Sequence, residues 1–280
     1  MSNFALKTSL LAGSVLVGLA LVPSSPQVAA QSAIPDFSSN GTAWQAGVGG
    51  EFLAVAGSPS PLRQDPAHPF VSNPEAARTG KQPTYRIADL SNPNIKQWAK
   101  DIMKKDNEEV LKGKIAYTPG QSCKPSGVPY FMLSGGPLFI VQTPKQVLLI
   151  TEGERSARRI YLDVPHSANV KPSWYGESVG KYEGDTLVID TIGQTNKTFI
   201  DNYRTPHTEK LHVVERFRMI DEGKTLEVQI SVDDPDTYNE PWKAVRRFNR
   251  TQATLGEEIC QEGNFILFDY GIPVDDKPDF

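Results

Sequence analysis

The feature that most constrains this chain of 280 residues is a series of short apolar or alternating runs that begins near Pro137 and is interrupted by turn residues. The runs occupy residues 138–142, 146–151, 158–163, 186–191, 211–219, 225–232, 242–249 and 264–269. Turn chemistry such as Glu183-Gly184-Asp185 separates them. Runs of this length and spacing indicate an antiparallel meander. So many strands in series favour a mainly β fold that closes into a barrel or a strongly curled sheet.

The residues before the runs predict an extended arm and one helix. Residues 31–84 contain prolines spaced too closely for a helical or strand period, which predicts an extended N-terminal arm that wraps the domain. Asn92-Pro93 opens a stretch near 93–112 in which apolar residues lie among charged ones, and Gly113 follows it. A cap residue, proline at the first position and glycine after the end are helix signals. We therefore expect a single β-rich domain over 31–280, with helix and barrel in 85–280.

The first thirty residues have the order of a signal peptide. Lys7 precedes an apolar run over 10–22, and Val28-Ala29-Ala30 forms a small-residue cleavage site. The run holds about 13 residues, whereas a membrane-spanning helix needs about 20. We expect cleavage after Ala30 and a periplasmic or secreted protein that is not inserted in a membrane.

The charge of the chain and the motifs it lacks argue against nucleic acid and nucleotides as binding partners. Residues 1–30 hold one of the 29 basic residues and none of the 33 acidic ones, so the expected mature chain is acidic. Its charges are interspersed, without the basic run or excess that binds nucleic acid. The chain also lacks the glycine-rich GxGxxG and P-loop patterns, so no nucleotide cofactor is expected. A small molecule is the expected partner.

Two cysteines, Cys123 and Cys260, lie in the expected exported part. Disulfides persist in such compartments, so a bridge between the two is the first interpretation. It would contribute on the order of 4 kcal/mol in the chain-entropy description. Two free thiols, one of them reactive, are the alternative.

Strand alternation places one carboxylate on an apolar face. In 211–219, Glu215 shares a face with leucine, valine, phenylalanine and methionine, whereas His212 lies on the opposite face. A buried carboxylate needs a cation or hydrogen-bond donors, or its pKa rises. Arg246, on the apolar face of the run that starts at Trp242, is a candidate partner. A structural ion pair and a pocket acid or base remain as alternatives for Glu215.

His212 is also a candidate general acid or base, because a histidine side chain gains and loses its proton near neutral pH. A surface histidine is the alternative. His207 and Glu209 lie nearby and are metal-ligand types. The spacing matches no metal motif, and Pro206 places His207 in a turn, so we assign no metal.

Further candidates come from a turn and from aromatic residues. Glu183 and Asp185 could divide acid and base roles, or could serve only the backbone of their turn. A substrate pocket could be lined by Trp174, Tyr182, Phe217, Trp242 and Arg246. The aromatic residues among these could equally be core.

Residues 172–191 read PSWYGESVGKYEGDTLVIDT. This phrase resembles SWxGxSxGxWEGDTLVVDT, which is shared by a large group of exported bacterial proteins. Residues 207–217, 233–242 and 258–264 match further phrases in the same order, so the resemblance covers residues 120 to 265. The chain departs from the pattern at Tyr182, where tryptophan is usual, and at Val164-Pro165-His166, where GRxHP is usual. The resemblance implies an exported β domain and no particular reaction.

Three functions remain open at this point. The first is a cofactor-free enzyme, a lyase, isomerase or hydrolase, which acts on a small organic molecule in an interior pocket through His212, Glu215, Glu183 and Asp185. The second is a lipocalin-like carrier that holds an apolar ligand and performs no chemistry. The third is a structural envelope protein in which the acids only make turns and ion pairs.

Overall fold

The computed structural model describes Met1, residues 34–38, 42–47, 50–71, 75, 78–79, 86–114, 117–154 and 156–260. The chain divides into two compact units, Met1–Ala33 and Ile34–Phe280, and the helices and strands of the described residues lie in the second. The expected signal peptide and the expected strand at 264–269 lie outside the described residues. Within the described part, no helix is long and apolar enough to cross a membrane.

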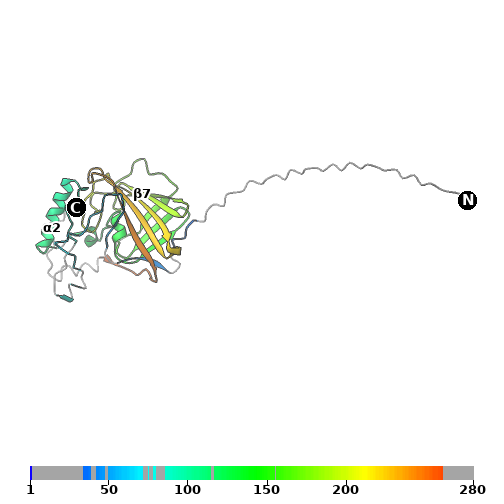
Figure 1. The fold of residues 1–280 in the computed structure, drawn as a ribbon, viewed down its shortest axis with the longest axis horizontal. Coiled ribbons are helices and arrows are strands. Elements are labelled where there is room, and N and C mark those ends of the chain that lie inside the picture. The colour runs from blue at the N-terminus through cyan, green and yellow to red at the C-terminus, as the bar shows by residue number, and fades with distance from the viewer. Residues whose placement is uncertain are drawn as a thin grey trace. The chain divides into compact units, whose positions relative to one another are not determined.

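Nine strands of the described residues close into a barrel, which confirms the expected fold class (Figure 1). They are β1 (Ala43–Ala46), β3 (Leu138–Gln142), β4 (Gln146–Thr151), β5 (Arg158–Leu162), β6 (Glu177–Glu183), β7 (Thr186–Ile192), β8 (His212–Ile220), β9 (Thr225–Asp233) and β10 (Trp242–Thr251). They are neighbours in chain order, and the pairing of β1 with β10 closes the ring. The short strand β2 (Leu53–Ala54) adds to β10.

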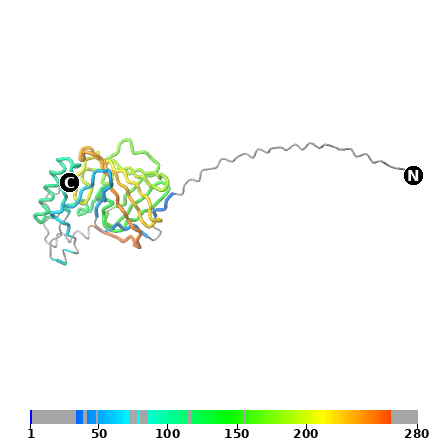
Figure 2. Tube along the Cα trace, in the orientation of Figure 1, coloured from blue at the N-terminus to red at the C-terminus, as the bar shows by residue number. Residues whose placement is uncertain are grey.

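The N-terminal segment completes the barrel. Strand β1 pairs with β3 on one side and with β10 on the other, so the earliest and the latest described strands lie side by side (Figure 2). The side chain of Gln142 on β3 anchors the segment just before β1. Its Oε1 accepts hydrogen bonds from the backbone N–H groups of Phe37 at 2.6 Å and Ser38 at 2.9 Å. The predicted arm therefore supplies a strand of the barrel.

One pair of neighbouring strands differs from the expected antiparallel meander. Strands β5 and β6 run parallel, with Ile160 opposite Ser178 and Leu162 opposite Gly180. A parallel pair cannot be joined by a tight hairpin and needs a long connection. Residues 163–176 supply it, and this crossover loop begins at Asp163 with φ 55°. The crossover loop carries His166 back over the outside of the barrel.

The predicted helix is present as α2 (Gln97–Leu111), but its start differs from the expected 93–112. The side chain of Asn92 accepts a hydrogen bond from the backbone N–H of Asn94 at 2.9 Å, so Asn92-Pro93 forms a turn and does not cap the helix. Ile95 then pairs with Tyr238 in an isolated bridge. At the other end, Gly113 follows the C-cap residue Lys112 and has φ 92°, as expected for a glycine after a helix end.

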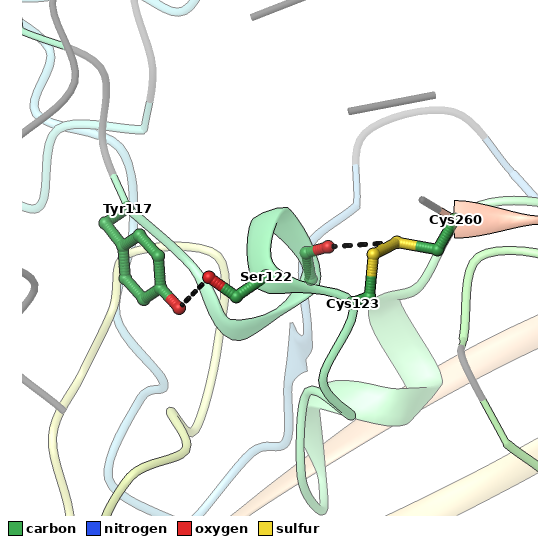
Figure 3. The surroundings of a disulfide bond; sticks show 5 residues. Tyr117, Ser122, Cys123 and Cys260 are labelled. Atoms are coloured by element: carbon green, nitrogen blue, oxygen red, sulfur yellow. Dashed lines mark hydrogen bonds between the residues drawn. A yellow bond between two sulfur atoms is a disulfide. The ribbon is translucent and has the colours of Figure 1, made fainter. Parts of the chain in front are cut away.

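The disulfide between Cys123 and Cys260 is formed, with the two Cα atoms 5.6 Å apart and a sequence separation of 137 (Figure 3). Cys123 follows the short 3₁₀ turn η1 (Pro119–Ser122), and a second 3₁₀ turn, η2 (Tyr130–Leu133), comes shortly after it. The bridge therefore attaches the chain that follows β10 to the turns that precede β3. This confirms the first interpretation of the two cysteines.

Candidate functional site

The inward face of the barrel holds one buried ion pair. Arg158 on β5 and Glu215 on β8 are both 0 % exposed. Arg158 donates from Nη1 to Glu215 Oε1 at 3.1 Å and from Nη2 to Oε2 at 2.5 Å. Two parallel bonds of this kind are the strong, geometrically specific form of an arginine–carboxylate contact. Alternation thus placed Glu215 on the correct face.

Two hydroxyl groups complete this inner cluster. Ser178 on β6 and Thr191 on β7 lie opposite each other in the sheet, and their oxygens are 2.9 Å apart. Arg158 Nη2 reaches Thr191 Oγ1 at 3.0 Å and Ser178 Oγ at 3.3 Å. Since both oxygens of Glu215 are bound by Arg158, the geometry favours the structural ion pair over a pocket base for Glu215.

The predicted pairing of Glu215 with Arg246 is wrong, because Glu215 is bound by Arg158. Arg246 donates to the backbone oxygens of Glu51 at 3.2 Å and Gly47 at 3.4 Å, in the segment after β1. Arg246 lies opposite Val228 in the sheet, whereas Glu215 lies opposite Ile230. Arg246 and Glu215 therefore lie at different heights along the barrel, and Arg158 is the residue that pairs with Glu215.

The outward face of β6, β7 and β8 carries a second cluster, the outer histidine cluster, made of His166, Glu177, Asp190 and His212. His166 comes from the crossover loop, and the others come from the three strands. Asp190 Oδ1 lies 3.0 Å from His166 Nε2 and 3.0 Å from His212 Nε2. His166 Nδ1 lies 3.0 Å from Glu177 Oε1. Carboxylate and imidazole therefore alternate along the cluster.

The acceptor nature of a carboxylate fixes where the protons sit. An ionised carboxylate only accepts, so a ring nitrogen beside it must carry the proton. For His212 this places the proton on Nε2, so a neutral ring has its lone pair on Nδ1. No described residue binds Nδ1, and the side chain is 41 % exposed. His212 thus presents a free basic nitrogen to solvent. His166 faces a carboxylate through both nitrogens, and only its doubly protonated form satisfies both contacts.

Glu177 is the fixed end of the outer histidine cluster. Ser167 donates to it twice, from Oγ at 2.5 Å and from its backbone N–H at 2.7 Å. These bonds, followed by the contact with His166, lower the pKa of Glu177 because they favour its charged form. Glu177 therefore remains an acceptor for His166.

The structure disperses the remaining candidates. Glu183, at the end of β6, pairs with Lys181 at 2.8 Å and Arg216 at 2.9 Å. Asp185 lies in the β6–β7 turn and accepts a bond from the hydroxyl of Thr186 at 2.9 Å. Neither of the two belongs to the outer histidine cluster, since Glu183 forms side-chain ion pairs and Asp185 contacts the hydroxyl of the next residue.

The aromatic candidates do not line one pocket. Phe217 and Trp242 are core residues, 0 % and 1 % exposed. Tyr182 accepts a hydrogen bond from Gln142 Nε2 at 2.8 Å. Trp174 lies in the crossover loop, with the ammonium of Lys124 5.5 Å from its ring centre.

His207 is buried, and its Nε2 lies 2.7 Å from Thr198 Oγ1. Its burial lowers its pKa. Glu209 is exposed, and His212 lies in the outer histidine cluster, so these three residues do not converge. In the described part of the chain, no group of three or more histidine, cysteine or acidic side chains could hold a metal ion.

Sequence reasoning missed six members of the two clusters: Arg158, Ser178 and Thr191 of the inner cluster, and His166, Glu177 and Asp190 of the outer histidine cluster. Arg158 shares the alternation of Ile160 and Leu162, and that pattern could have revealed an inward arginine. His166, Glu177 and Asp190 had no local signal. The antiparallel pairing of β6 and β7 brings Glu177 and Asp190 onto one face, and the crossover loop between β5 and β6 brings His166 to them.

Comparison with known proteins gives no match. No family model, no curated protein and no solved structure matches the chain. The site must therefore be interpreted from its own geometry.

Proposed function

We propose that this protein is an exported enzyme that transfers protons on a small organic molecule without a cofactor, with His212 as the general base and acid. The observation that carries the proposal is the contact between Asp190 Oδ1 and His212 Nε2 at 3.0 Å, on an exposed face, with Nδ1 left unbound by described residues. A carboxylate that orients a histidine while the second nitrogen faces the substrate is the arrangement that general base catalysis needs.

The proposed site differs from the interior pocket that the sequence suggested. Glu215 is held by Arg158 and has no free oxygen, so it takes no part in the proposed chemistry. Asp190 takes the role of orienting carboxylate, and His166 and Glu177 hold Asp190 in place. The charged pair in the barrel interior also disfavours a carrier of apolar ligands, because an apolar ligand offers an ion pair no hydrogen bonds.

Export is part of the same proposal. Its supports are the signal-peptide order of residues 1–30, the resemblance to exported bacterial proteins, and a disulfide of the kind that persists in oxidising compartments. Sequencing the N-terminus of protein recovered from the cell envelope tests it. We expect a mature chain that starts at Gln31, and recovery of an intact Met1 terminus would contradict export by cleavage.

The experiment on the chemistry uses 5-nitrobenzisoxazole, whose ring opens when a base removes one carbon-bound proton. We expect His212→Gln to reduce the rate of ring opening about 100-fold, within the range for loss of a general base. His68→Gln is the matched control, because His68 also contacts a carboxylate, Asp65, at 2.8 Å and has a similar exposure of 39 %. Equal rates for the wild type and His212→Gln would contradict the proposal.

A further inference from the structure

A cavity of about 190 Å³ lies between the two 3₁₀ turns that precede β3 and the β4–β5 connection. Its polar lining includes Lys124, Ser126, Tyr130, Ser134, Glu154 and Asn202. None of these residues belongs to the outer histidine cluster or to the inner ion pair, so the cavity is a separate feature of the fold.

Glu154 is the organising group of this cavity. Its Oε2 accepts hydrogen bonds from the hydroxyl of Tyr175 at 2.7 Å and from the backbone N–H of Ser126 at 3.1 Å. Its Oε1 accepts from the hydroxyls of Ser126 and Ser134. Each carboxylate oxygen therefore has two donors, and the carboxylate is fully satisfied by the protein.

This arrangement determines whether the serine hydroxyls of the cavity wall act as hydrogen-bond donors or acceptors toward a ligand. A serine hydroxyl has one proton and two lone pairs. Because Ser126 and Ser134 direct their protons to Glu154, their oxygens can only accept hydrogen bonds from a ligand. A ligand must therefore bring several donors of its own.

The charges that line the cavity and its volume further restrict the class of ligand that it can bind. The negative charge of Glu154 disfavours an anion, and the positive charge of Lys124, which also lines the cavity, disfavours a cation. A neutral ligand is favoured. A cavity of roughly 150 Å³ is enough to hold one benzene molecule. We propose that this cavity binds a small neutral polyhydroxylated molecule, a polyol or a monosaccharide with one six-membered ring.

The disulfide holds one wall of the cavity. Gly120 and Lys124 both line it, and Cys123, which is bonded to Cys260, lies between them in sequence. Cys260 Sγ also lies 3.8 Å from the backbone oxygen of Gly120. The wall is therefore fixed before a ligand arrives, which lowers the entropy lost on binding.

Saturation-transfer NMR on the full, disulfide-bonded chain tests the proposal with D-glucose and glycerol as probes, and with acetate and methylammonium as charged probes of small size. We expect transfer to glucose or glycerol and none to the charged probes. Ser134→Ala removes one acceptor and is expected to weaken binding about tenfold, the loss of roughly one good hydrogen bond. Ser38→Ala is the matched control, because Ser38 also donates to a carboxylate, that of Asp36, at a site remote in sequence from the cavity lining.

A second variant keeps the test decisive if Ser134→Ala disturbs the fold. Ser134→Thr retains the hydroxyl and adds a methyl group that fills part of the cavity, so binding is expected to be lost while the circular dichroism spectrum is unchanged. The proposal is overturned if neither polyol gives transfer with the wild type, if only a charged probe does, or if both Ser134 variants bind as the wild type does. Loss of ring opening in His212→Gln would not affect this result, because the two sites share no residue.

Discussion

The neighbouring strands β7 and β8 hold a buried charge on their shared inward face, Glu215 of β8, and exposed charged groups on their outward face, and the surroundings of the two differ. On the inward face, Glu215 is 0 % exposed and both of its oxygens are bound by Arg158. On the outward face, Asp190 and His212 are 40 % and 41 % exposed, and one nitrogen of His212 has no partner among the described residues. Burial requires that both charged oxygens of Glu215 be bound, whereas exposure allows a group whose proton can move. We therefore assign the inner cluster to stability and the outer histidine cluster to chemistry.

The largest expected effect comes from breaking the inner pair. Glu215→Gln leaves the charge of Arg158 buried without a counter-ion, and we expect the free energy of unfolding to fall by about 3–5 kcal/mol. Urea denaturation followed by circular dichroism measures the change. The double variant Arg158→Met with Glu215→Leu should recover most of the loss, because it removes both charges and keeps the volume filled. A loss below 1 kcal/mol for Glu215→Gln would show that the inner cluster does not stabilise the barrel.

The same contrast between buried and exposed carboxyl groups predicts opposite pH effects. Asp201, in the β7–β8 loop, is fully buried, and desolvation raises its pKa from 3.8 to about 6 despite hydrogen bonds from Thr205 and Tyr203. Its folded-state pKa is above its unfolded value, so its contribution to stability is complete below pH 3.8 and is lost as the pH rises through about 6. This loss is expected to be on the order of 3 kcal/mol.

Comparing unfolding free energies of the wild type and Asp201→Asn across that pH range checks this prediction. The wild type should lose stability relative to Asp201→Asn as the pH rises. A constant difference between the two proteins would contradict the raised pKa.

Removing charge from the outer histidine cluster should have a smaller effect on stability. Asp190→Asn is expected to change the free energy of unfolding by about 1 kcal/mol or less, since exposed ion pairs contribute little. The same substitution should slow ring opening of 5-nitrobenzisoxazole, because His212 loses the carboxylate that orients it. A stability loss as large as that of Glu215→Gln, without a change in rate, would reverse the two assignments.

The smallest expected effect concerns Glu177. Hydrogen bonds from Ser167 and the contact with His166 lower its pKa below 4.5 in the folded state. Its contribution to stability is therefore present above pH 4.5 and is lost as the pH falls through the lowered folded value. Glu177→Gln should thus be slightly less stable than the wild type near neutral pH and equal to it in strong acid. Thermal unfolding at both pH values measures the difference, and an equal difference at both would contradict the lowered pKa.

The inward position of Glu215 in the barrel was predictable from the sequence, but its partner was not assigned correctly. Alternation in β8 placed Glu215 inward, and the hairpin spacing predicted an antiparallel meander that closes into a barrel or a strongly curled sheet. The same alternation in β5 puts Arg158 on the face of Ile160, so the correct partner was within reach. Arg246 was chosen instead because alternation gives the face of a residue but not its level along the barrel.

Of the outer histidine cluster, only His212 was predicted from the sequence. Asp190 and Glu177 lie on ordinary polar faces of β7 and β6, and His166 lies in a loop whose path depends on the parallel pairing of β5 and β6. No local pattern reveals a parallel register between two strands that follow one another in the chain. Four residues that are distant in sequence therefore became a site only in the folded structure.

The measurement that tests the central claim most directly is a long-range ¹H–¹⁵N NMR spectrum of the histidine rings, with His212→Gln used to assign the His212 signals. Such a spectrum shows which ring nitrogen carries the proton in a neutral histidine. We predict that neutral His212 carries it on Nε2, toward Asp190, and has a bare Nδ1, and that Asp190→Asn mixes the two forms. A His212 ring with its proton on Nδ1 in the wild type would contradict the proposed base.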